Sequence, residues 1–373
     1  MTEFINNPYL LLFAFVLLIQ LVFIWILFGR LAFRRKDDNL PADYELRPVS
    51  VIIVAKNEAE NLYNNLPKIL SQSYPDFEVI VVDDQSKDES TDVLKALKKH
   101  YHQLEIVYIG HDVNERQGKK LALSLGIKKA KNELLLFTDA DCSPVSDNWI
   151  KLMVRGLKGD KEIVTGFSPY SKQKGLLNLI VQYDTYNTAL QYLSFSLAGM
   201  PYMGVGRNLL YTKSLFFKHA FNGHLHLPYG DDDLFVNKNA SSRNTSIEIH
   251  KDSFMMSAPP QTFKRWVRQK RRHLKAGKEY KKSHKWWLGG IWFSYFIFMA
   301  LFALNVVISP LSLYVWGIFA LRFVSSTIVS GLSLRKFGMI RLIWFMPVLE
   351  LIYNVLYVPL MSLNAKFSKI ISW

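Results

Sequence analysis

Long apolar runs at the two ends of the chain constrain its fold more than any other feature. Residues 9–28 are nearly uncharged, with Gln20 as the one strongly polar interruption, and further runs cover about residues 287–308, 311–332 and 341–363. A helix of about 20 apolar residues crosses a bilayer and satisfies its own backbone hydrogen bonds there. The sequence therefore predicts an N-terminal transmembrane anchor in residues 1–33 and about three transmembrane helices in residues 286–373.

The charges beside these runs predict their orientation. Glu3 precedes the first run, and four cations follow it: Arg30, Arg34, Arg35 and Lys36. A cleaved signal peptide has basic residues before its apolar run, so we interpret the first run as an uncleaved anchor rather than a leader or a buried core helix. By the positive-inside rule, the region between the runs then lies in the cytoplasm, and the protein is integral to the inner or plasma membrane of the cell.

The middle of the chain alternates between short apolar strands and helical segments. Residues 49–55, 77–82, 104–109 and 134–139 are expected to form strands. Such alternation predicts an α/β domain with a mostly parallel, doubly wound sheet, here over residues 49–258. The polar residues 34–48, which contain two prolines, are expected to form a linker.

Acidic residues follow three of these strands. Glu58 comes after the first strand, Asp84 after the second, and Asp139 and Asp141 end the 134–139 strand. Ligands of open α/β sheets bind at the carboxyl ends of the strands. Residues i and i+2 of an extended chain face the same way, and paired carboxylates suit Mg²⁺ or Mn²⁺ holding the phosphates of a nucleotide. A turn with solvated aspartates is the alternative for an isolated Asp-x-Asp.

The second half carries strong charge. Asp231, Asp232 and Asp233 are adjacent, so either water or a cation must lie nearby. The segment 259–285 is dense in lysine and arginine, which are expected to bind lipid headgroups or a diphosphate. Residues 176–197 form either a helix at the membrane interface or a core helix, because polar side chains interrupt their apolar pattern.

Composition excludes some classes of protein and leaves others open. The net charge of +15 is compatible with a nucleic-acid or an anionic membrane partner. The single cysteine, Cys142, excludes an intramolecular disulfide or a cysteine-cluster zinc site, and a packed thiol is expected rather than a reactive one. Glu350 lies inside the last apolar run, where an acid is a candidate functional residue or serves helix packing.

Six segments follow one another along the chain: Val51–Glu58, Val81–Ser86, Gly118–Lys120, Asp139–Asp141, Gly230–Asp233 and Gln269–His273. In this order they resemble an inverting family-2 glycosyltransferase with a GT-A fold. The resemblance covers about Val49 to Lys275, and more narrowly it is to the membrane-anchored branch that includes cellulose and hyaluronan synthases and ceramide glucosyltransferases.

The resemblance implies roles for individual residues. The nucleotide-sugar donor would be bound by Asp84, Glu58, Lys119, Asp139, Gln269 and Arg272. Asp141, with Asp139 beside it, would hold the Mg²⁺ or Mn²⁺ ion. Asp232 would be the catalytic base, with Asp231 in place of the glutamate of the family's Glu-Asp pair, and the register within Asp231–Asp233 is open by one residue. His273 replaces the tryptophan that processive synthases have after Gln-x-x-Arg, which weakens a long-polymer interpretation.

The expected function is therefore a membrane-bound glycosyltransferase that moves a sugar from a donor, expected to be a UDP-sugar, to a lipid or saccharide acceptor with inversion. Two alternatives are a catalytically inactive transferase-like scaffold and a basic membrane protein that binds anionic lipid or nucleic acid. A scaffold would be expected to lose Asp141 or Asp232, and both are present. Acidic strand ends would repel nucleic acid and the chain has no recognisable nucleic-acid module, so no such partner is expected.

Overall fold

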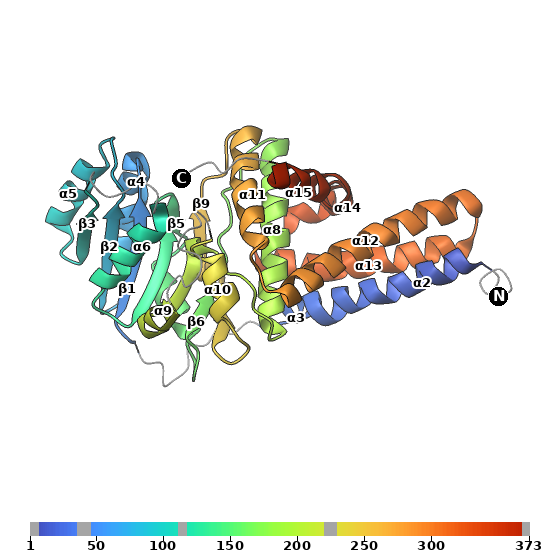
Figure 1. Cartoon of the computed structure of the whole chain (residues 1–373), viewed down its shortest axis with the longest axis horizontal. Coiled ribbons are helices and arrows are strands. Elements are labelled where there is room, and N and C mark those ends of the chain that lie inside the picture. Colours follow the sequence, from blue (N-terminus) through green and yellow to red (C-terminus); the bar gives the residue numbers. More distant parts are fainter. Residues whose placement is uncertain (1–6, 36–45, 111–117, 220–229, 368–373) are drawn as a thin grey trace.

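A computed structural model of the chain describes residues 7–35, 46–110, 118–219 and 230–367. Most of the predicted linker, residues 36–45, lies outside these ranges. The described chain has an α/β part at one end and a group of long helices that projects from it (Figure 1).

The α/β part is built on a mixed sheet with the strand order β3-β2-β1-β4-β7-β6-β8. Strands β1 to β4 are parallel, whereas β7 runs antiparallel to both β4 and β6. The strands are β1 Val49–Ala55, β2 Phe77–Asp83, β3 Leu104–Tyr108, β4 Leu134–Asp139, β6 Ile163–Thr165, β7 Leu209–Thr212 and β8 Thr245–Ile247, and a second, two-stranded sheet pairs β5 Cys142–Pro144 with β9 Met255–Ser257. The predicted, mostly parallel sheet is confirmed.

Every residue of β1 is apolar or small, and all of them are buried. Apolar side chains therefore point to both faces of the parallel strands, and helices cover both faces. Val51 and Ile53 pack in one core, whereas Ile52 and Val54 pack in another with residues of α6. Gly126 permits the close approach of α6, since a Cβ there would lie 2.9 Å from Ile52 Cγ2. The helices of this part are α4 Ala59–Leu70, α5 Ser90–His100, α6 Gly118–Lys129, α7 Trp149–Arg155, α9 Lys213–His219 and α10 Asp233–Asn239, with 3₁₀ turns η3 Gly206–Asn208 and η4 Lys251–Ser253.

The register of the sheet brings the predicted strand-end acids level with one another. Ala55 of β1 pairs with Asp83 of β2, and Val54 of β1 pairs with Asp139 of β4. The residues that leave these three strands therefore meet at one edge of the sheet.

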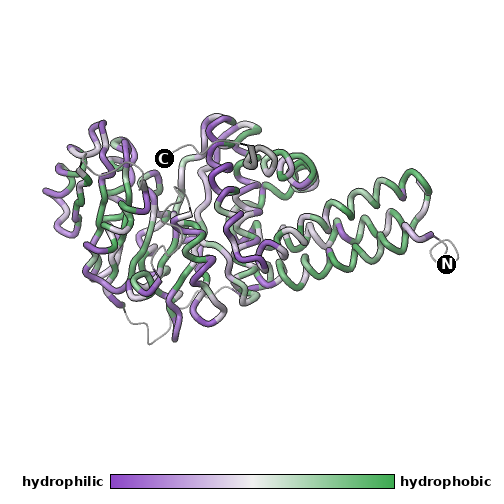
Figure 2. Tube along the Cα trace, in the orientation of Figure 1, coloured by the Kyte–Doolittle hydropathy of each residue, from purple (hydrophilic) through white to green (hydrophobic). Residues whose placement is uncertain are grey.

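Four helical segments among the described residues are long and apolar enough to cross a membrane: Pro8–Ala32, Lys282–Ile308, Leu313–Lys336 and Ile340–Ser362. The first comprises α2 Pro8–Leu21, η1 Val22–Phe28 and α3 Gly29–Ala32, and the next two are α12 Lys282–Ile308 and α13 Leu313–Lys336. These three segments contact one another and project together (Figure 1), with hydrophobic residues along most of their length (Figure 2). One N-terminal and three C-terminal apolar segments were predicted, and all four are present.

The fourth segment is not one regular helix. It consists of η5 Ile340–Phe345, α14 Met346–Leu351, η6 Ile352–Tyr357 and α15 Val358–Phe367. Pro347 lies in the first turn of α14, where a missing N–H breaks no helical hydrogen bond. In Figure 1 this segment lies near the α/β part, and α15 contacts α11 Phe263–Gly277, the helix that carries much of the basic segment.

Helix α8, Leu176–Leu197, joins the two parts. It contacts β8 of the sheet as well as η1 and α3 of the first apolar segment. Tyr183 and Tyr186 of α8 share one core with Leu334 and Phe337 at the end of α13. Of the two expectations for residues 176–197, the core helix is confirmed, since α8 is largely buried where the α/β part meets the apolar segments. A position at the membrane interface stays a prediction.

Candidate active site

Lys119 connects two groups of acids that lie far apart in the sequence. It is the second residue of α6, and its Nζ lies 2.7 Å from Asp139 Oδ1 at the end of β4 and 3.4 Å from Asp231 Oδ2 before α10. Burial opposes the lysine charge, but the two aspartates raise the pKa of Lys119 above its usual value. Burial also opposes the charge of Asp139, whose pKa is nevertheless lowered by Lys119. One member of the predicted metal pair, Asp139, and one of the two predicted catalytic acids, Asp231, thus contact the same lysine.

Asp141 lies two residues beyond Asp139, and the small second sheet fixes its position. Cys142 of β5 pairs with Ser257 of β9. The Ser257 hydroxyl donates to Asp141 Oδ2 at 3.2 Å, and the Cys142 thiol donates to Asp141 Oδ1 at 3.3 Å. Burial raises the pKa of the Cys142 thiol well above its usual value, which fits the expectation of a packed residue and not a reactive one.

The Asp139–Asp141 pair fits a divalent ion that is shared with a ligand. Burial and the nearby Asp139 raise the pKa of Asp141, so the two carboxylates repel each other and a cation would relieve the repulsion. No group of three or more His, Cys, Asp or Glu side chains in the described ranges could hold a metal ion. Mg²⁺ is usually bound by one or two carboxylates together with water and substrate phosphates, which is the set that this pair would need.

The three adjacent aspartates have different surroundings. Asp232 caps α10: its Oδ1 accepts from the Asp233 N–H at 2.8 Å, and its Oδ2 accepts from the Gly206 N–H. A Cβ at position 206 would lie 3.0 Å from Asp232 Oδ2, which explains the glycine. Burial and the neighbouring Asp231 raise the pKa of Asp232 to about 6.

Asp233, by contrast, is held by hydrogen bonds within the protein interior. Its Oδ2 accepts from the Tyr280 hydroxyl at 3.0 Å and its Oδ1 from the Leu234 N–H at 2.8 Å. Burial raises the pKa of Asp233 well above its usual value. The geometry therefore brings Asp231 and Asp232 to Lys119 and turns Asp233 toward the interior.

Arg207 is a site residue that the sequence analysis did not single out. Its guanidinium lies 4.4 Å from the centroid of the Tyr170 ring, and its charge acts on both Asp139 and Asp141. The buried Nη1 of Arg207 donates to no group among the described residues. An arginine after a Gly-Val-Gly turn is a weak signal in a sequence, because only the fold shows that the turn faces the end of β4.

Helix α11 brings the predicted Gln269 and Arg272 to the same region. Gln269 Nε2 donates to the Tyr170 hydroxyl at 2.8 Å, so Tyr170 lies between Gln269 and Arg207. Arg272 is close enough to Asp139 to lower its pKa. Lys270 forms an ion pair with the buried Asp184 of α8, and His273 is exposed.

The loops after β1 and β2 are joined by hydrogen bonds. The Asn57 N–H donates to Ser86 Oγ at 2.9 Å, and the Glu58 N–H donates to Ser90 Oγ at 2.9 Å. Burial raises the pKa of Glu58, and the charges of Asp141 and Asp139 raise it further, so Glu58 is near the pair. Asp84 Oδ2 lies 3.5 Å from Lys56 Nζ, on the β2 side of the same edge.

Comparison with known proteins agrees with this arrangement. Residues 50–216 match the family model described as Glycosyl transferase family 2. The chain is 32% identical over 173 residues to glycosyltransferase AglE of Haloferax volcanii, which covers 46% of this chain and 52% of that protein. It is 29% identical over 174 residues to the poly-beta-1,6-N-acetyl-D-glucosamine synthase of Staphylococcus epidermidis, covering 46% of this chain and 40% of that protein.

A solved structure shares the fold of nearly the whole chain. The mannosyltransferase PcManGT from Pyrobaculum calidifontis, determined in complex with GDP-Man and Mn²⁺, superposes with a TM-score of 0.57 at 18% identity and covers 93% of this chain and 99% of that one. The family match, the two glycosyltransferase relatives and this fold lead to one conclusion: the chain carries a family 2 glycosyltransferase domain with the GT-A fold, joined to apolar helices that are long enough to cross a membrane.

Proposed function

We propose that this protein transfers a sugar, with inversion, from a nucleoside-diphosphate sugar to a hydroxyl of a lipid or saccharide acceptor at the cytoplasmic face of a membrane. The observation that carries the proposal is Lys119, whose ammonium contacts both Asp139 and Asp231. This contact supports a single site in which a predicted donor-binding acid, Asp139, and a candidate base, Asp231, lie on either side of Lys119. A domain that only bound lipid would not need this juxtaposition.

The donor would lie across the ends of β1, β2 and β4. We assign Asp84 and Glu58 to the nucleotide, Asp139 to the ribose and sugar, and Asp141 to the metal. A bound Mg²⁺ or Mn²⁺ would neutralise charge on the diphosphate. Lys119, Gln269 and Arg272 were predicted to bind the donor, and the unused Nη1 of Arg207 supports adding this residue to them.

Asp232 is the proposed base. As an acceptor hydroxyl attacks the anomeric carbon, the carboxylate takes its proton, and the bond from that carbon to the phosphate oxygen breaks to release the nucleoside diphosphate. A pKa of about 6 suits a base that works near neutral pH. Cations preorganised beside the leaving group stabilise its developing charge. Asp231 is the rival, because it lies directly against Lys119.

The membrane-associated parts are assigned as follows. Residues 1–33 and 286–373 are the membrane domains, 49–258 the catalytic domain and 259–285 the basic interface segment. The cations of α11 and the apolar segments support an acceptor that is delivered at the membrane surface. The positive-inside rule supports a cytoplasmic active site.

A donor screen tests the proposal. Purified full-length protein is incubated with each of a panel of UDP- and GDP-sugars with Mg²⁺ or Mn²⁺, and released nucleoside diphosphate is measured. Release from one donor, lost in Asp141→Ala, is the expected result and identifies the sugar. The absence of release from every donor, with and without membrane lipid, would favour the scaffold alternative. A UDP-sugar remains our prediction, although the structural relative was solved with GDP-Man.

A further inference from the structure

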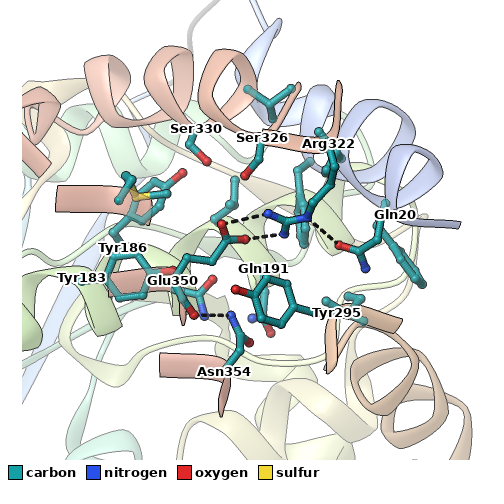
Figure 3. A pocket seen from close by; sticks show the side chains of 18 residues that line it. Gln20, Tyr183, Tyr186, Gln191, Tyr295, Arg322, Ser326, Ser330, Glu350 and Asn354 are labelled. Atoms are coloured by element: carbon teal, nitrogen blue, oxygen red, sulfur yellow. Dashed lines mark hydrogen bonds and ion pairs between the residues drawn. The ribbon is translucent and has the colours of Figure 1, made fainter. Parts of the chain in front are cut away.

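A polar cavity lies where α8 meets the apolar segments, and none of the strand-end acids lines it. It is lined by residues of α2, η1, α8, α12, α13, α14 and η6, and its volume is about 70 Å³. Figure 3 shows the side chains that point into it, with Arg322 and Glu350 facing each other across one side. The cavity is therefore a hydrophilic space among segments that are otherwise apolar.

The charges of the cavity cancel. Arg322 binds Glu350 through two hydrogen bonds, with Nη1–Oε2 at 3.0 Å, and its Nε donates to Gln20 Oε1 at 3.2 Å. Its guanidinium also lies 4.7 Å from the centroid of the Tyr295 ring. Because all three nitrogens of the guanidinium have partners, the cavity has no cation to spare for a phosphate.

Three other polar side chains in the cavity have unused hydrogen-bonding capacity. They come from three different helices: Gln191 of α8, Tyr295 of α12 and Ser326 of α13. None of their side-chain polar atoms forms a hydrogen bond within the described part of the chain, although Tyr295 is only 5% exposed. Gln191 and Ser326 are partly exposed, whereas Tyr295 is buried, and a buried polar group is stabilised by a polar occupant.

We infer that this cavity binds the uncharged, hydroxylated headgroup of a membrane lipid, namely a neutral hexose headgroup. The balanced Arg322–Glu350 pair disfavours an anionic headgroup, and the amide of Gln191 with the hydroxyls of Tyr295 and Ser326 can donate to and accept from sugar hydroxyls. The exposed apolar faces of the surrounding helices would contact the acyl chains. This inference rests on the membrane location proposed above, and the lipid is either an acceptor or a resident lipid that is not modified.

Lipid titration of the full-length protein tests the inference. Delipidated protein in detergent is mixed with monoglucosyl-diacylglycerol, diacylglycerol or phosphatidylglycerol of the same acyl chains, and bound lipid is counted by native mass spectrometry. We expect the wild-type protein to bind the glucolipid at least tenfold more tightly than the other two. Gln191→Leu and Tyr295→Phe, which leave the ion pair intact, should each remove most of that preference. Tyr9→Phe is the matched control on an exposed position of α2 and should bind like the wild-type protein.

Equal binding of the three lipids, or unchanged preference in both cavity variants, would overturn the inference and leave a cavity filled by water. Melting temperatures that match the wild-type value show that the variants fold. Adding the nucleotide sugar distinguishes an acceptor lipid from a resident lipid. Transfer of sugar to the glucolipid identifies an acceptor, and binding without transfer identifies a resident lipid. Asp232→Asn separates this inference from the proposed function, because it should stop transfer and leave glucolipid binding unchanged.

Discussion

Asp232 has the surroundings of a poised base at the scale of single residues. Two backbone N–H groups orient its carboxylate, while burial and Asp231 raise its pKa to about 6. Its neighbour Asp233 has a structural partner in Tyr280. Asparagine retains the size and the acceptor oxygen of each residue but cannot take a proton, so the three positions can be compared by one substitution.

We expect Asp232→Asn to lower kcat about a hundredfold or more with little change in donor affinity, because a base acts on the acceptor. Asp233→Asn should remain active and fold normally, since the amide oxygen can still accept from Tyr280. In the wild-type protein, kcat should fall as the pH drops through about 6, where the Asp232 carboxylate becomes protonated. Steady-state kinetics from pH 5 to 8 measure both effects. Near-wild-type turnover of Asp232→Asn beside an inactive Asp231→Asn would move the base to Asp231.

Asp141→Ala should abolish turnover and remove the dependence of donor binding on divalent ions. The physical reason is that the remaining carboxylate, Asp139, is already paired with Lys119. Calorimetric titration with the donor found in the screen, with and without a chelator, measures this dependence. Ser257→Ala, which removes only a hydrogen bond to Asp141, is the milder comparison and should retain some metal dependence. If the wild-type protein binds the donor equally well with and without the chelator, Asp139 and Asp141 do not hold a metal ion and belong to an ordinary turn.

The sequence could predict the acids at strand ends because each follows an apolar run that forms a parallel strand. It could not identify Arg207 or Ser257 as neighbours of those acids. Both reach the site from segments more than 60 residues further along the chain, and β7 and β9 beside them are too short to show a period. Contacts of this kind are created by tertiary pairing and leave no local pattern.

At the scale of elements, α11 is held by a buried ion pair. Lys270 of α11 binds Asp184 of α8, whose side chain is 2% exposed and also accepts from the Tyr353 hydroxyl at 3.1 Å. Three separate elements thus meet at one carboxylate. Since Gln269 and Arg272 lie on the same helix, the ion pair orients the part of α11 that we propose binds the donor.

Asp184→Leu should destabilise the protein by about 3–5 kcal/mol, because it leaves the Lys270 ammonium, whose side chain is only 14% exposed, without its partner. It should also raise the KM for the donor, since α11 loses its orientation. Thermal unfolding and donor kinetics measure these effects. Lys131→Gln is the matched control: its lysine pairs with Glu78 but is 70% exposed, so the change in stability should be below about 1 kcal/mol. Equal stability of Asp184→Leu and the control would show that the pair contributes nothing.

At the scale of the whole molecule, polar contacts join the apolar segments to one another. Gln20 donates to Ser294 Oγ at 2.7 Å and accepts from Arg322, which binds Glu350. One residue from each of the four segments takes part. The sequence leaves two roles open for Glu350, a functional one and one in helix packing. In the structure Glu350 pairs with Arg322, a residue of the apolar run 311–332 that the sequence analysis did not single out.

The topology predicts which surfaces face the cytoplasm. A cysteine placed at Asp88 on a Cys142→Ser background should not react with an impermeant maleimide added outside intact cells, and it should react after the cells are opened. A cysteine at Leu311, which is 91% exposed between α12 and α13, should react from outside. Labelling of position 88 in intact cells would reverse the proposed orientation.

The position of α8 has a consequence for how the protein can be produced. Its aromatic residues belong to one core with side chains from both the sheet and the apolar segments. A truncated enzyme that begins at β1 and ends before α12 would leave this surface open to water and would be prone to aggregate. We therefore expect the transferase domain to fold stably only in a chain that keeps its first and last helices.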